Sequence, residues 1–73
     1  QMWISGNTLY LNTPEKAGQS ALLEVFDVSG KMLTSRTLTL NELTTIELKQ
    51  KGLIIVRLTT GEDVWTTKGI LTR

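Results

Sequence analysis

The chain has 73 residues, 40% of them hydrophobic, and contains neither cysteine nor histidine. This length predicts one small domain over residues 1–73, and the missing side chains exclude a thiolate or histidine nucleophile and a Cys/His zinc site. Eight Lys and Arg against seven Asp and Glu give a net charge of +1, which argues against nucleic acid as a partner. Because the chain begins at Gln1, we interpret it as a domain excised from a longer parent.

The composition favours β-structure throughout. Twelve threonines, five isoleucines and four valines are β-branched, and such residues suit a pleated, half-buried surface. Turn residues at short intervals divide the chain into seven expected strands, at residues 2–5, 8–11, 19–28, 31–40, 43–48, 53–60 and 63–72. Almost no helix is expected. Gly6-Asn7 is expected to form a primed hairpin turn.

Alternation of apolar and polar residues predicts which side chains face a core. Three groups are assigned to the interior: Thr44, Ile46 and Leu48; Ile54, Val56 and Leu58; and Leu22, Phe26 and Val28, with Leu23 and Val25 opposite them. Strands 19–28 and 53–60 are apolar on both faces, which predicts central positions covered on both sides. An antiparallel two-sheet β-sandwich is the favoured fold, with an open five-stranded barrel as the alternative.

The expected strands carry little reactive chemistry. Glu62-Asp63 is the only acidic pair, and we interpret it as a solvated turn, because neighbouring strand residues point to opposite faces. The serines have no histidine to activate them. We therefore expect no enzyme activity, no metal site and no cofactor.

Two other groups invite a binding hypothesis. Trp3, Tyr10 and Trp65 suggest a carbohydrate platform, although packing at the edge of a thin core is the favoured interpretation. A basic set is expected mainly to be solvated, with an anionic partner such as lipopolysaccharide or an acidic receptor groove as the alternative: Lys49, Lys51, Lys68 and Arg73. The last strand, residues 63–72, is a candidate edge for strand addition by a partner or for self-association.

Four short segments follow one another along the chain: residues 23–31 (LEVFDVSGK), 43–48 (LTTIEL), 52–58 (GLIIVRL), and Gly61 followed by 68–71 (KGIL). The first resembles a strand followed by Asp, two residues and Gly-Lys, which is a signature of the C-terminal sorting domains of the type IX (Por) secretion system. The other three resemble that family's later segments, in the same order. The resemblance covers roughly residues 9 to 73.

This resemblance implies an immunoglobulin-like β-sandwich that acts as an address label for export in Bacteroidetes. In that family the parent reaches the periplasm, passes through an outer-membrane translocon and is attached to anionic lipopolysaccharide by a sortase-like surface protease, or released. Carried over by position, the motif residues are Asp27, Gly30, Lys31, Gly52, Val56, Arg57, Gly61 and Lys68. The alternative function is a β-sandwich module that stays on a surface attachment component and binds lipopolysaccharide or another glycan.

Overall fold

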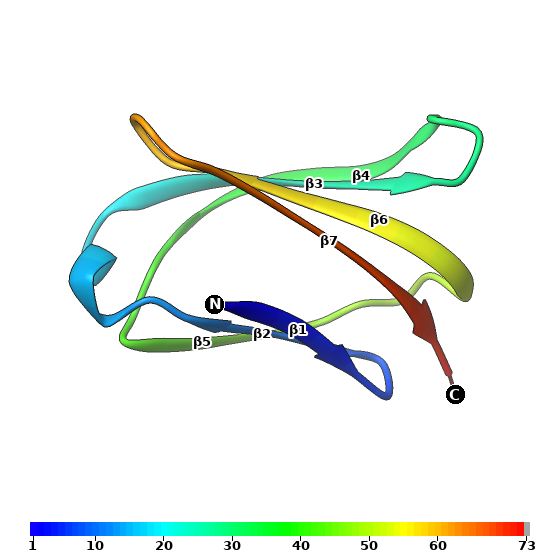
Figure 1. Ribbon diagram of the computed structural model, residues 1–73, viewed down its shortest axis with the longest axis horizontal. Coiled ribbons are helices and arrows are strands. Elements are labelled where there is room, and N and C mark those ends of the chain that lie inside the picture. Colours follow the sequence, from blue (N-terminus) through cyan, green and yellow to red (C-terminus); the bar gives the residue numbers. More distant parts are fainter. Residues whose placement is uncertain (73) are drawn as a thin grey trace.

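The computed structural model describes residues 1–72, which form seven β-strands and one short 3₁₀ turn (Figure 1). The elements are β1 (Met2–Ser5), β2 (Thr8–Asn12), η1 (Pro14–Lys16), β3 (Ser20–Asp27), β4 (Met32–Thr39), β5 (Leu43–Glu47), β6 (Gly52–Thr59) and β7 (Val64–Leu71). The seven expected strands are thus confirmed, and no strand end differs from its expected position by more than one residue. Residues 1–72 include no α-helix, and no helix there is long and apolar enough to cross a membrane.

The strands form two antiparallel sheets that face each other, as Figure 1 shows. One sheet has the order β1-β2-β5 and the other β4-β3-β6-β7. In the constant-type immunoglobulin arrangement, strands 1, 2, 4 and 5 form one sheet and strands 3, 6 and 7 the other; here the fourth strand belongs to the second sheet. The other six strands keep their immunoglobulin positions, so the fold is an immunoglobulin-like β-sandwich. The alternative prediction of a five-stranded barrel is wrong, because the strands form two separate sheets.

A core of aliphatic side chains fills the space between the sheets. Its fully buried members come mainly from β2, β3 and β6, namely Leu9, Leu11, Leu23, Val25, Ile54, Val56 and Leu58, together with Leu40, which follows β4. The expected inward faces of β5 and β6 are confirmed, since Thr44, Ile46 and Leu48 are buried and alternate with exposed residues.

The prediction for β3 is wrong, because its two faces are exchanged. Leu23 and Val25 are fully buried in the core, whereas Leu22 is 37% and Val28 63% exposed. Glu24 decides the orientation. It lies on the outer face opposite Arg57 in the neighbouring strand, where its charge has a partner that the aliphatic core would not offer. Alternation cannot predict which face of this strand is buried, because both its odd-numbered and its even-numbered residues are apolar.

The central positions of β3 and β6 are confirmed, but their outer faces are not fully covered. Leu22 and Leu53 remain 37% and 45% exposed there. The β1–β2 turn agrees with the expected primed class, since Gly6 has a φ of 63° while Asn7 has a negative φ. A type I′ turn requires positive φ at both central residues, so the turn instead fits the type II′ preference for glycine at the first of them.

Candidate functional site

The Asp27 side chain organises the turn between β3 and β4. Its Oδ1 accepts hydrogen bonds from the backbone N–H of Ser29 at 2.9 Å, the Ser29 hydroxyl at 2.6 Å and the backbone N–H of Lys31 at 3.0 Å. The Asp27 backbone carbonyl accepts another bond from Gly30 N–H at 3.1 Å. Short polar side chains that bond to the backbone just ahead of them are favoured in such turns.

These bonds also change the acidity of the Asp27 carboxyl. The hydrogen bond from the Ser29 side chain, followed by that from the Lys31 backbone, lowers its pKa below the ordinary value of 3.8. Each donor stabilises the ionised form. The first motif segment therefore has a structural role, because the carboxylate holds the hairpin that carries β4.

Two motif glycines have backbone angles that favour glycine. Gly30 has a φ of 92° and Gly52 a φ of 85°, a region that other L-residues rarely adopt. Gly61 differs from both. Its φ is not in this region, and within residues 1–72 no atom lies within 4 Å of a Cβ built there.

One end of the sandwich gathers several turns that are distant in the sequence. The Leu48 N–H donates to Asn7 O at 2.8 Å and the Thr72 N–H to Gly6 O at 3.2 Å, while Gly52 pairs with Leu71. Three exposed lysines lie in the loops at this end: Lys31, Lys49 and Lys51. A shallow hollow of about 200 Å³ is lined there by Asn7, Glu47, Leu48 and Lys49. Arg73, the other expected basic contact, lies outside the described residues.

The remaining motif residues lie on β6 and β7 and differ in their accessibility. Val56 is buried in the core, and the exposed Lys68 lies opposite Ile55, the outward-facing neighbour of Val56. Arg57 is also on the outer face, where its Nε donates a hydrogen bond to Glu24 Oε1 at 2.9 Å and its Nη2 forms an ion pair with the same oxygen at 2.9 Å. Its guanidinium lies 5.0 Å from the centre of the Phe26 ring. Lys68 therefore offers a more available charge to a partner than Arg57 does.

The aromatic residues do not form a flat platform. Trp3 and Tyr10 are cross-strand neighbours whose rings stack on each other at 5.3 Å, with an angle of 7° between their planes. Each ring covers one face of the other, which reduces the flat surface left for a sugar. Trp65 is half-buried and packs against the core, as the packing interpretation expects. For Trp3 that interpretation is wrong, because its side chain is 39% exposed.

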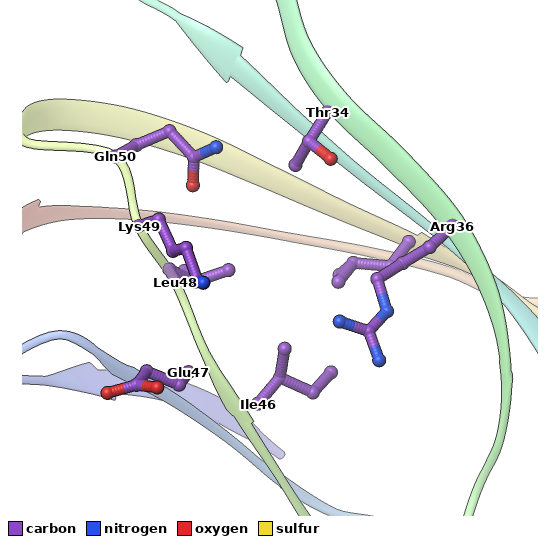
Figure 2. Close-up of a pocket in the computed structure, with 8 residues that line it drawn as sticks. Thr34, Arg36, Ile46, Glu47, Leu48, Lys49 and Gln50 are labelled. Carbon is purple, nitrogen blue, oxygen red and sulfur yellow. The ribbon is translucent and has the colours of Figure 1, made fainter.

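The side of the sandwich between β4 and β5 is open. Its cavity of about 180 Å³ is lined by Leu23, Thr34, Arg36, Ile46, Glu47, Leu48, Lys49 and Gln50. Figure 2 shows Thr34 and Arg36 of β4 on one side of it and the segment from Ile46 to Gln50 on the other. Gln50 Oε1 is buried and has no hydrogen-bond partner among residues 1–72. Sequence reasoning missed this site, although the even positions of β4 carry a signal: Thr34 and Arg36 are polar where a sandwich strand normally faces its core.

Within the described range, no group of three or more acidic side chains is placed to hold a metal ion. Comparisons of the chain with protein-family models, with curated proteins and with solved structures found no match.

Proposed function

We propose that the chain is a C-terminal secretion signal domain that directs its parent through the type IX secretion system. The observation that carries the proposal is the resemblance of four ordered segments to the sorting domains of that system. The structure gives two of these segments a local role, through the Asp27 turn and the positive φ angles of Gly30 and Gly52. These residues determine the local structure of the signal domain, and the exposed Lys68 is the motif residue most accessible to a receptor.

The proposed mechanism needs no reactive group in this chain, and we assign the domain no catalytic role, cofactor or metal. The folded domain is recognised in the periplasm by the outer-membrane translocon. A sortase-like surface protease then processes the parent for attachment to lipopolysaccharide or for release at the cell surface. Recognition of a whole folded surface fits a sandwich whose exposed cations sit on strands and turns.

A reporter assay tests this proposal. Residues 1–73 are fused to the C-terminus of a fluorescent protein that carries a signal peptide, in a Bacteroidetes host, and the reporter at the cell surface is quantified. We expect surface delivery, and a loss of at least about tenfold in Lys68→Gln, since a charged contact contributes about 1.5–3 kcal/mol. The matched control is Arg36→Gln, which removes an exposed cation outside the four motif segments and leaves delivery unchanged. A reporter that stays in the periplasm contradicts the proposal.

The second candidate function is a retained module that binds anionic lipopolysaccharide. It is favoured by the three lysines at one end of the sandwich and by the hollow beside Lys49. Saturable binding of purified lipopolysaccharide at low salt, weakened in the double variant Lys49→Gln/Lys51→Gln, supports it. Mass spectrometry of the mature parent separates the two functions, because a cleaved label is absent from the surface protein and a retained module is present.

A further inference from the structure

The free edge of β5 presents backbone groups to the open side of the sandwich. β5 pairs with β2 in a register that places Thr8 opposite Glu47 and Leu11 opposite Thr44. The bonds from Leu48 N–H to Asn7 O and from Thr13 N–H to Glu42 O show that the even residues of this segment bond toward β2. In an antiparallel ladder the alternate residues face the other way. The N–H and C=O groups of Leu43, Thr45 and Glu47 therefore point away from β2. Within residues 1–72, no strand pairs with β5 on that side.

The groove beside this edge combines an apolar floor with a cation. Leu23 and Ile46 are buried at its base, and the exposed Arg36 has no hydrogen bond or ion pair within the described part of the chain. In Figure 2 the Arg36 guanidinium extends toward Ile46, whereas the Glu47 carboxylate points to the opposite side of its strand. Glu47 also accepts a bond from Asn7 Nδ2 at 3.4 Å. The charge that faces the groove is thus positive, and it fits a carboxylate.

The buried Gln50 oxygen provides an independent indication of a ligand. A buried acceptor without a partner is unfavourable, so a bound group that donates a hydrogen bond to Gln50 Oε1 would relieve this cost. Backbone N–H groups of an added strand are donors of this kind. The groove therefore offers ladder groups, an unused acceptor, an apolar surface and a cation side by side.

The shape of the open side favours one extended segment over a second copy of the domain. Strands in a sheet lie about 4.8 Å apart, so one added strand needs little room beside β5. The inner face of β4 stands across the groove from β5. A second sandwich that paired its own β5 here would also have to bring its second sheet to this side, and so needs more room than one strand does.

We infer that this groove binds an extended peptide that adds to the β5 edge and carries an acidic side chain for Arg36. Side chains two residues apart in a strand share a face. The peptide therefore has an apolar residue over Leu23 and Ile46 and, two positions away, an aspartate or glutamate that pairs with the guanidinium. This site is separate from the proposed export signal and does not rest on it.

The test uses the full chain and the peptide acetyl-Thr-Thr-Val-Thr-Glu-Thr-Thr-amide, followed by NMR of backbone amides. We expect saturable binding with slowed hydrogen exchange at Leu43, Thr45 and Glu47. A peptide with Gln in place of Glu should bind at least about tenfold more weakly, as the loss of a charged hydrogen bond predicts. Arg36→Gln should remove this preference, and Lys31→Gln, at the β3–β4 turn, should preserve it.

A second pair of variants tests the backbone contacts. Thr45→Pro removes an N–H that the peptide needs and should abolish binding. Thr37→Pro is the matched control, since the bond from Leu40 N–H to Gln19 O and the β3–β4 register place the Thr37 N–H on the free edge of β4. The inference is overturned if no β5 amide responds to the peptide, if the response lies at β4 or β7, or if Arg36→Gln retains the preference for glutamate.

Discussion

The two sides of this sandwich differ in how closely the sheets approach. On one side β1 lies beside β7, where the Thr72 N–H donates to Gly6 O at 3.2 Å and the Ile4 side chain packs over Gly69. On the other side β4 and β5 leave a cavity of about 180 Å³. The residues on the inner faces explain the difference: Gly69 removes a side chain where β1 approaches, whereas Thr34 and Arg36 place polar groups where burial would be unfavourable.

The comparison teaches that edge strands decide where such a sandwich is closed and where it stays accessible. The central strands β3 and β6 fill the core with fully buried aliphatic residues. At the edges, Gly69 lies where the sheets are in contact, and Thr34 and Arg36 line the cavity where they are apart. A surface for a partner can thus arise from two polar positions in one strand without any change in topology.

The largest expected effect is the difference in stability between proline substitutions at two adjacent threonines of β5. Thr44→Pro removes a ladder bond to β2 and the hydroxyl that accepts a bond from the Asn41 N–H at 2.9 Å. We expect it to lower the free energy of unfolding by roughly 2–4 kcal/mol. Thr45→Pro loses an N–H that faces the open side and should cost less than about 1 kcal/mol. Urea denaturation measures both, and equal losses would contradict the assignment of the β5 free edge.

A smaller effect is expected on the closed side. A Cβ at Gly69 would lie 2.8 Å from Ile4 Cδ1 and 3.2 Å from Ile4 Cβ, so Gly69→Ala should destabilise the domain by about 1–3 kcal/mol. Ile4→Ala introduced with it should cost less than the sum of the two single changes. The matched control is Gly61→Ala, where nothing in the described structure requires glycine. If Gly61→Ala is as harmful as Gly69→Ala, close contact between β1 and β7 is not what selects glycine.

Much of the fold could be predicted from the sequence because the strands are short and separated by clear turns. Period-2 alternation placed Ile46, Ile54 and Val56 correctly in the core. Alternation failed for β3, because both its odd-numbered and its even-numbered residues are apolar. The orientation of this strand depends on the pair that Glu24 forms with Arg57 in the neighbouring strand. Such a pair cannot be predicted before the register of the two strands is known.

The candidate sites also differ in how far they could be predicted from the sequence. Local bonding explains why Asp27 and Gly30 occur together, so their positions could be recognised as a motif. The groove combines Arg36 with Ile46 and Gln50, which belong to different segments and meet only when the sheets pack. A site of this kind depends on the β5 edge and the position of β4, and neither is encoded in the spacing of neighbouring residues.

The smallest expected effect is acid loosening of the open side, through the turn that precedes β4. Since folding lowers the pKa of Asp27 below 3.8, its contribution to stability is fully present above that value. It is lost as the pH falls through the lower folded pKa. β4 is hydrogen-bonded only to β3 in the described sheet, so its amides should show faster exchange in acid before those of β1 and β7.

The Ser29 hydroxyl makes this prediction specific to the turn, because its bond is the largest cause of the shift. In Ser29→Ala the pKa of Asp27 should rise toward 3.8 when the carboxyl carbon is followed by NMR titration, and the acid response of β4 should begin at higher pH. In Asp27→Asn, which has no carboxyl to titrate, this response should be reduced. If β1 and β7 loosen together with β4 in all three proteins, the two sides unfold as one unit and their difference is confined to packing in the native state.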